Sequence, residues 1–180
     1  MGCQDANWPE FDSHLHPYVK ERLIGRFSAD VASVSNEEIR DHAAAELNRW
    51  IAERGSKKAS EALDFAKSNG RGVSGLRRVL QALETGEVQS IFLSENYSSR
   101  AVQCPNCGHL DAHLVPSCVA CGHATRELND VCDAIIPIAI RRDIELFYLK
   151  EHADLERAGN IAALLRFRAD QTTGQIAVAS

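Results

Sequence analysis

The stretch GVSGLRRVLQALETGEVQSIFLSE, residues 72–95, contains the patterns of a helix and of a strand in direct succession. Its first half has apolar residues at helical spacing, which predicts an amphipathic helix with the buried stripe Leu76, Val79, Leu80 and Leu83. Ser74 can cap the start of this helix, and Gly86 is well placed to end it in a left-handed conformation. Val88–Ser94 is a short apolar run between turn residues, which predicts a buried strand.

A long helix is predicted before this stretch. Ser35 is a good N-terminal cap, and Glu38 occupies the capping-box position three residues later. Apolar residues then follow at helical spacing on one face: Ile39, Ala43, Leu47, Trp50 and Ile51. The polar run 55–58 either interrupts the helix or is part of it, and in the second case the helix ends at Asn69-Gly70.

Further elements are predicted after residue 126. Leu128–Ile140 has the pattern of a helix, in which Pro137 predicts a kink or an early end. Ile144–Leu149 and Ile161–Phe167 are apolar runs typical of strands, and between them lies a short helix over Glu151–Arg157, ended by Gly159. Helices that alternate with apolar strands predict an α/β layered domain with a small central sheet.

The chain is expected to divide into three parts. Residues 1–34 have a poor amphipathic pattern with one short helix over Tyr18–Leu23, and they are expected to be an N-terminal extension or a remnant of a preceding domain. Residues 35–170 form the α/β domain, with an insertion at residues 100–126. Residues 171–180 are a polar tail that we expect to be flexible.

The composition is that of a soluble globular protein, with 180 residues, 44% hydrophobic and 25% charged. A net charge of −5 makes tight nonspecific binding to nucleic acid a poor prospect, although a local basic patch stays possible. No apolar run approaches the ~18–20 residues that a membrane span needs. The N-terminus, MGCQDANWPEF, lacks the pattern of a signal peptide. We therefore expect a cytoplasmic protein without a membrane partner.

Four of the six cysteines form two CxxC pairs, Cys104/Cys107 and Cys118/Cys121. Such pairs supply the four soft ligands of a closed tetrahedral zinc site. Gly108 and Gly122 follow the pairs and let the backbone turn. The pattern therefore predicts one structural Zn²⁺, because four sulfur ligands leave no position for a catalytic water.

The remaining cysteines and the histidines near the pairs receive less specific interpretations. His109 and His123 follow the two glycines and could substitute as ligands, but an exposed position or a hydrogen bond to a ligand is the better expectation. His113 is expected to be a solvated loop residue. Cys132 is expected to be a small buried side chain, and Cys3 to be free.

No catalytic motif is found. The sequence has no P-loop, no G-x-G-x-x-G after a strand, no HExxH and no GxSxG. Weaker candidates are better explained as loops or solvated faces: Gly70-Arg71-Gly72, His14 with His16, Glu95, and the arginine pairs Arg141-Arg142 and Arg166/Arg168. We therefore expect neither an enzyme nor a small-molecule substrate.

The order of these motifs resembles a known family. Residues 72–95 are similar to a segment of the C-terminal domain of archaeal and eukaryotic class 1 peptide chain release factors, a domain that Pelota proteins share. In archaeal members a CxxC…CxxC insertion follows the strand, as it does here. Gly159–Phe167 (GNIAALLRF) resembles the family's ending G-G-I-A-A-L-L-R-Y, with Asn160 in place of the second glycine. The resemblance covers roughly residues 35–168 and is closest to the bacterial relatives.

The resemblance implies a three-layer α/β/α sandwich with a small mixed sheet, similar to kink-turn-binding ribosomal proteins, plus an inserted zinc ribbon. In the family this domain docks a translational GTPase and sits at the ribosome, without reading the stop codon or hydrolysing peptidyl-tRNA. The hydrolytic Gly-Gly-Gln motif is absent. A C-terminal fragment, a late gene start and a degenerate paralogue all stay open.

An RNA-binding module of the kink-turn type is the alternative function, because the implied fold is shared with those proteins. Its candidate surface is Gly70–Gly75 with Arg71, Arg77 and Arg78, at the predicted start of the second helix. The net acidity of the chain counts against this alternative.

Overall fold

The computed structural model describes residues 1–30 and 32–169, so the tail expected at 171–180 lies outside the described residues. The contacts within the chain divide it into two units, Met1–Arg54 and Gly55–Ser180. The long helix α3 (Asn36–Lys67) contains the boundary.

The first unit consists of short elements and the beginning of α3. These elements are the parallel pair β1 (Gly2–Cys3) and β2 (Phe27–Ser28), a 3₁₀ turn (Asp5–Asn7), α1 (Trp8–His14) and α2 (Pro17–Lys20). None of residues 1–30 is buried. The helix expected over Tyr18–Leu23 is shorter than predicted and begins one residue earlier, at Pro17. Helix α1 was not expected from the sequence.

The capping box predicted for α3 is confirmed. The backbone N–H of Ser35 donates to Oε2 of Glu38 over 2.8 Å, and the N–H of Glu38 donates to Oγ of Ser35 over 3.2 Å. The helix then runs without a break to Lys67. Gly55 lies in the interior of this helix. A Cβ at this position would come within 2.8 Å of Cδ1 of Phe147, so glycine permits close packing of α3 against the sheet.

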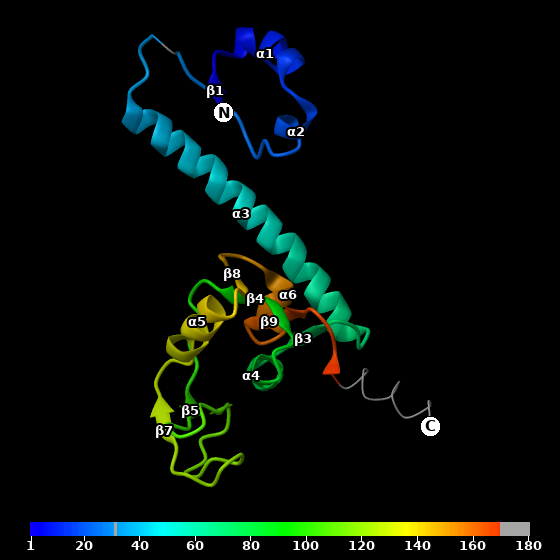
Figure 1. The fold of residues 1–180 in the computed structure, drawn as a ribbon, viewed down its shortest axis with the longest axis vertical. Helices are drawn as coiled ribbons and strands as arrows, with labels where there is room; N and C mark the ends of the chain where they lie inside the picture. Colours follow the sequence, from blue (N-terminus) through cyan, green and yellow to red (C-terminus); the bar gives the residue numbers. More distant parts are fainter. Residues whose placement is uncertain (31, 170–180) are drawn as a thin grey trace. The chain divides into compact units, whose positions relative to one another are not determined.

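The central sheet has four strands in the order β3-β9-β4-β8 (Figure 1). They are β3 (Gly72–Ser74), β9 (Ile161–Leu165), β4 (Val88–Ser94) and β8 (Glu145–Leu149). β4 and β8 are parallel, and β9 is antiparallel to both of its neighbours. The sheet is therefore mixed, as expected, and β9 is buried along its whole length.

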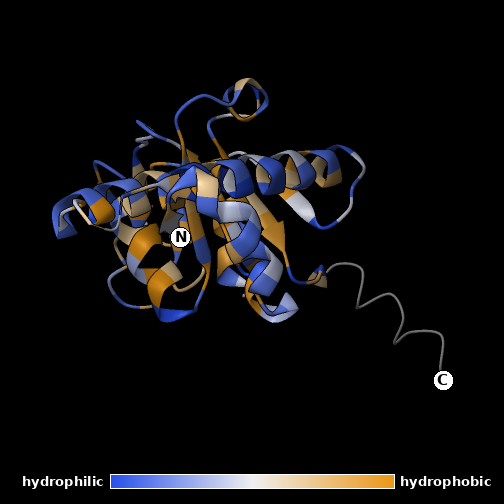
Figure 2. Ribbon diagram, turned by 90° about the horizontal axis from the view of Figure 1, so that it is seen from above, coloured by the Kyte–Doolittle hydropathy of each residue, from blue (hydrophilic) through white to orange (hydrophobic). Residues whose placement is uncertain are grey.

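Helices cover both faces of the sheet. On β4, Ile91 and Leu93 belong to the cluster under α4 (Leu76–Glu84) and α5 (Cys132–Arg141), whereas Phe92 points to the opposite cluster. That second cluster contains Ala59 and Leu63 of α3 and Leu155 of α6 (Ala153–Arg157). Figure 2 shows the strands largely in the hydrophobic colour, with hydrophilic residues on the helices around them. The three-layer α/β/α sandwich is confirmed.

Two details differ from the expectations for this sandwich. Gly72–Ser74 is the edge strand β3 and not part of a loop, and Ser74 does not cap α4, whose N-terminal neighbour Gly75 has φ +82° and provides no side chain. The predicted helix 128–140 begins only at Cys132, because Leu128 pairs with Ala101 in a strand. Pro137 does not end this helix early, and α5 continues to Arg141.

A small lobe is inserted between β4 and α5. Its strands β5 (Ala101–Gln103), β6 (Leu110–Asp111) and β7 (Arg126–Leu128) form an antiparallel sheet in the order β6-β5-β7. Ala101 is buried in the main core, and Leu110 packs against that core. In the described part of the chain, no helix combines the length and the apolar character required to cross a bilayer.

Candidate metal centre

The two CxxC segments form turns of the same geometry. In the first, the N–H of Gly108 donates to the carbonyl of Cys104 over 2.9 Å, and the N–H of Cys104 donates to the carbonyl of His109 over 2.9 Å. In the second, the N–H of Gly122 donates to the carbonyl of Cys118, and the N–H of Cys118 donates to the carbonyl of His123, each over 2.8 Å. The sequence repeat Cys-x-x-Cys-Gly-His is therefore a repeat in structure.

The backbone conformation of each turn requires glycine, whereas the space around the glycine would admit a side chain. Gly108 has φ +78° and Gly122 has φ +76°, and an added Cβ would meet no atom within 4 Å in either place. L-residues with a side chain rarely adopt this left-handed conformation. The expectation that glycine lets the chain turn after each pair is confirmed.

The turns bring all four sulfur atoms together. The Sγ atoms of Cys104, Cys107, Cys118 and Cys121 lie within 4.8 Å of one another. The pairs Cys104–Cys121 and Cys107–Cys118 are separated by 3.4 and 3.6 Å. A tetrahedral zinc site with bonds of about 2.3 Å places its sulfur ligands about 3.8 Å apart, whereas a disulfide needs about 2.05 Å. The spacing is therefore compatible with zinc, and neither of these pairs lies at disulfide distance.

Hydrogen-bond donors favour a thiolate in this cluster. The pKa of Cys121 is lowered to about 5, first by the backbone N–H of His123 and then by the side-chain amide of Asn106, whose Nδ2 lies 3.7 Å from the sulfur. At Cys107 the backbone N–H of His109 lowers the pKa, but burial and hydrogen bonds with the other three cysteines outweigh it and raise the pKa to about 12. Zinc binds cysteine as the thiolate, so the donors around Cys121 favour metal binding at that sulfur.

The histidines near the cluster have different roles. His109 is 15% exposed, its Nδ1 lies 2.7 Å from Oε1 of Glu84 on α4, and its Nε2 is buried without a partner among the described residues. His123 is exposed, with Nδ1 3.2 Å from the carbonyl of Cys121. His113 is 62% exposed beside Asp111, as expected for a solvated loop residue. His109 thus links the lobe to the sandwich, which the sequence pattern did not reveal.

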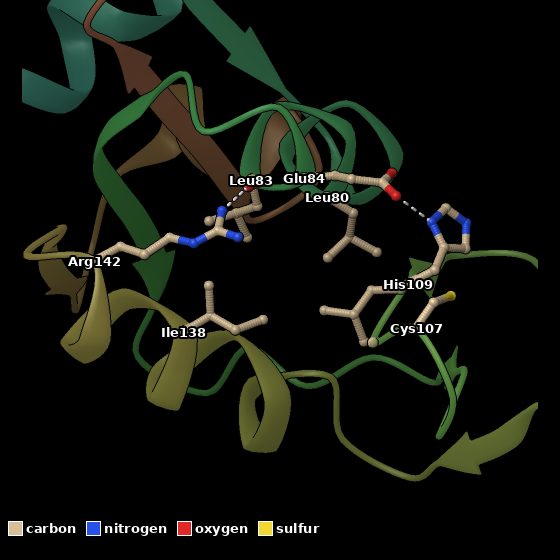
Figure 3. Close-up of a pocket in the computed structure, with 9 residues that line it drawn as sticks. Leu80, Leu83, Glu84, Cys107, His109, Ile138 and Arg142 are labelled. Carbon is tan, nitrogen blue, oxygen red and sulfur yellow. Dashed lines mark hydrogen bonds and ion pairs between the residues drawn. The ribbon is translucent and has the colours of Figure 1, made fainter. Parts of the chain in front are cut away.

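A cleft of about 230 Å³ lies between α4, α5 and the first cysteine turn (Figure 3). Its apolar lining is Leu80, Leu83, Leu110 and Ile138. The guanidinium of Arg142 donates to the carbonyl of Leu83 at one end, and the His109–Glu84 pair lies at the other. The lobe therefore forms one wall of a cleft whose other walls belong to the sandwich.

The weaker candidates are not brought together. His14 contacts the carbonyl of Glu10, and His16 accepts from the N–H of Tyr18 at the start of α2. Glu95 is ion-paired with Lys150. Among the described residues, the four-cysteine cluster is the one group of three or more potential metal ligands.

Two further candidates are explained by their position. Cys132 is buried, and desolvation raises the pKa of its thiol to about 12, which disfavours a nucleophilic thiolate. Arg71 lies just before β3, whereas Arg77 lies on α4 after the other end of that strand.

A solved structure shares the fold of this chain over most of its length. The C-terminal domain of a peptide chain release factor from Methanosarcina mazei matches with a TM-score of 0.54 and 19% identity, covering 79% of this chain and 98% of that domain. The fold is that of a release-factor C-terminal domain. The resemblance of fold expected from residues 72–95 and 159–167 is confirmed.

Longer solved proteins give weaker matches to this release-factor fold. Pelota from Archaeoglobus fulgidus matches with a TM-score of 0.45 and 13% identity, covering 93% of this chain and 48% of that protein. Pelota in a model of the ribosome-bound archaeal Pelota–ABCE1 complex matches with a TM-score of 0.49 and 17% identity, covering 89% of this chain and 40% of that one. The chain spans less than half of these proteins. No protein-family model and no curated protein matches the sequence.

Proposed function

We propose that this chain is a non-catalytic, translation-related docking domain that associates with the ribosome and with a translational GTPase in the cytoplasm. The observation that carries the proposal is the match to nearly the whole of an isolated release-factor C-terminal domain. The resemblance of residues 72–95 and 159–167 to the family's motifs also supports it. The docking role is the one that the resemblance implies for this domain.

The same proposal includes one structural Zn²⁺, held by Cys104, Cys107, Cys118 and Cys121. Four converging sulfur atoms and two glycine turns support it. Zinc bound by four thiolates supplies folding energy and has no open position for substrate. Elemental analysis of the purified protein is expected to find one zinc per chain, and Cys107→Ser is expected to lower that content, whereas Cys3→Ser is not.

The absence of an enzymatic role is also part of the proposal. Two serine hydroxyls lie near histidines, Ser13 Oγ 3.0 Å from Nδ1 of His14 and Ser60 Oγ 3.2 Å from Nε2 of His152, but both pairs are exposed and neither histidine has a carboxylate partner among the described residues. The one buried thiol outside the zinc cluster, Cys132, has a raised pKa. Nuclease and esterase assays on the full chain are expected to give no turnover above a buffer control.

Co-sedimentation tests the docking role. Tagged protein is added to cell extract and centrifuged through sucrose at low salt, with and without a non-hydrolysable GTP analogue. We expect the protein to sediment with ribosomes and a GTPase to co-purify when the analogue is present. Protein that stays at the top of the gradient in both conditions would contradict the proposal.

A further inference from the structure

The second cysteine turn belongs to a short hairpin over residues 113–124. The N–H of Thr125 donates to the carbonyl of Pro116 over 3.0 Å, and Ser117 forms an antiparallel β-bridge with Ala124. These contacts hold the two arms of the segment side by side, with the cysteine turn at its tip. We call this segment the cysteine hairpin.

The surface of the cysteine hairpin is exposed, partly apolar and free of acidic residues, lysine and arginine. Nine of its twelve residues are exposed, and none of the twelve is Asp, Glu, Lys or Arg, whereas 25% of the whole chain is charged. Leu114 is 45% exposed and Val119 is 69% exposed. Depletion of charged residues together with exposed apolar side chains is typical of the centre of a protein–protein interface.

The dimensions of the hairpin suit a single contact. Leu114 lies five residues before Val119, so their Cα atoms are at most about 18 Å apart. A standard interface buries about 800 Å² on each partner, which corresponds to a width of about 30 Å. The positions of both apolar side chains therefore lie within the width of one interface.

The charge of the lobe is negative when the proposed metal is bound. Residues 100–128 contain two arginines and two carboxylates, which cancel: Arg100, Asp111, Arg126 and Glu127. Both arginines lie outside the hairpin, and Arg100 is paired with Glu127. Zn²⁺ with four thiolates adds a formal charge of about −2. Two of the sulfur ligands, Cys107 and Cys121, are at least partly exposed, so the tip of the lobe attracts basic groups.

This distribution of charge excludes several kinds of partner. RNA and anionic membranes are bound through Lys and Arg side chains, which the hairpin lacks. A second copy bound symmetrically through the same hairpin would bring two negative clusters together. A protein surface with an apolar patch and a border of Lys or Arg is complementary in both respects. Ribosomal proteins offer such surfaces, because proteins that bind RNA are rich in basic residues.

We propose that the cysteine hairpin docks on a ribosomal protein, on an apolar patch bordered by basic residues. Val119, at the tip, contacts the apolar patch, and the cluster of thiolates attracts the basic border. The inference rests on the proposed function and deepens it, because it names the contact surface and assigns the contact to protein and not to ribosomal RNA.

Binding to purified ribosomes tests the inference through the sign of an added charge. Each variant is sedimented with increasing amounts of ribosomes, and the bound fraction gives the affinity. Val119→Lys is expected to lower the affinity about tenfold or more, because it removes an apolar contact and places a positive charge against basic residues. Val119→Glu is expected to lower it less, because the carboxylate is attracted to the same residues. Contact with RNA would reverse this order, since an added lysine strengthens binding to phosphates.

Matched controls separate docking from loss of fold. Ile140 on α5 is 72% exposed, so Ile140→Lys and Ile140→Glu make the same changes on the sandwich and are expected to leave the affinity unchanged. Zinc content and melting temperature are measured for every variant, because Val119 lies between two proposed ligands. Leu114→Lys lies outside the cysteine turn and is expected to weaken binding about threefold or more, so the test does not depend on position 119 alone.

A photo-crosslinking amino acid at position 119 identifies the class of the contacted molecule. Irradiation of the ribosome complex is expected to give an adduct that survives ribonuclease and contains one ribosomal protein, identified by mass spectrometry. An adduct that ribonuclease digests, or no adduct from protein that sediments with ribosomes, would contradict the inference. The same crosslinker at position 140 is the control and is expected to give no ribosomal adduct.

Three results of the sedimentation would overturn the inference: unchanged affinity of Val119→Lys and Leu114→Lys, tighter binding by Val119→Lys, or an equal loss in the Ile140 variants. If the wild type does not sediment with ribosomes at all, the docking role fails and the inference fails with it. If the wild type sediments and the hairpin variants bind equally well, the docking role stands and the inference alone fails.

Discussion

The α/β sandwich and the inserted lobe are stabilised by different means. In the sandwich, strands β4 and β9 place buried apolar side chains on both faces of the sheet, and helices cover each face. In the lobe, residues 100–126, the buried side chains are Ala101, Val102, Cys104 and Cys118. Two of these four are proposed zinc ligands, and the other two belong to the strand that leaves the sandwich.

The difference shows how a domain can carry a segment that has no core of its own. Apolar burial contributes about 25 cal/mol per Å², which the sandwich obtains from many residues and the lobe from few. The lobe instead has four sulfur donors whose binding of metal would provide its folding free energy. The two regions should therefore respond differently to metal removal and to core substitutions.

Metal removal is expected to have the largest effect, because structural zinc sites provide apparent free energies of about 10–16 kcal/mol at pH 7. Cys107→Ser or chelation should abolish protection against hydrogen exchange in residues 104–123 and leave β4 and β9 protected. Exchange measured by mass spectrometry checks this, with Cys3→Ser as the control. If the whole chain unfolds cooperatively instead, the lobe and the sandwich are one folding unit.

A core substitution should act on both regions. Phe92 is fully buried and stacks on Phe147 with ring centroids 5.6 Å apart. Phe92→Ala should lower the free energy of unfolding by about 3–5 kcal/mol, because it creates a cavity under α3. Urea denaturation measures the loss. Tyr148→Ala, which removes a side chain that is 49% exposed on the neighbouring strand, is the control and should cost far less.

Features that depend on nearby residues could be predicted from the sequence. The strand Val88–Ser94, the left-handed Gly86 with φ +75° and the capping box of Ser35 and Glu38 are confirmed, because each is decided within a few residues. The clustering of the four sulfur atoms also followed from spacing, since each CxxC turn is local and glycine decides its conformation.

Features that depend on distant partners could not be predicted. Gly72–Ser74 has only three residues and no strand pattern, and it becomes a strand because β9, about ninety residues later, pairs with it. The start of α5 is delayed because Leu128 pairs with Ala101 across the lobe. The His109–Glu84 contact joins residues 25 positions apart, and no motif indicates it.

The contact between the lobe and α4 should have an intermediate effect. Glu84→Ala removes the partner of the mostly buried His109 ring and leaves a second ring nitrogen without a hydrogen bond. Loss of one such bond costs about 1 kcal/mol. Exchange protection of β6 should therefore fall while that of β4 stays constant. The exposed Glu61 provides the control substitution, Glu61→Ala. Equal loosening of both strands would show that Glu84 stabilises the sandwich and not its contact with the lobe.

The smallest effect is expected where neither a metal nor a core contributes, at the exposed first turn of α3. Donation from the backbone and then from the hydroxyl of Ser35 holds the pKa of the Glu38 carboxyl below its ordinary value of 4.5. A carboxyl whose pKa is lower in the folded state than in the unfolded state stabilises the fold at pH values above the unfolded pKa. This contribution is lost as the pH falls through the folded pKa. Amide protection of residues 37–39, measured by NMR, should therefore be constant near neutral pH and decrease below about pH 4.

Glu38→Gln should flatten this pH dependence, and Ser35→Ala should lower protection by roughly fivefold at neutral pH. An unchanged pH profile in Glu38→Gln would mean that another group near the helix start is responsible.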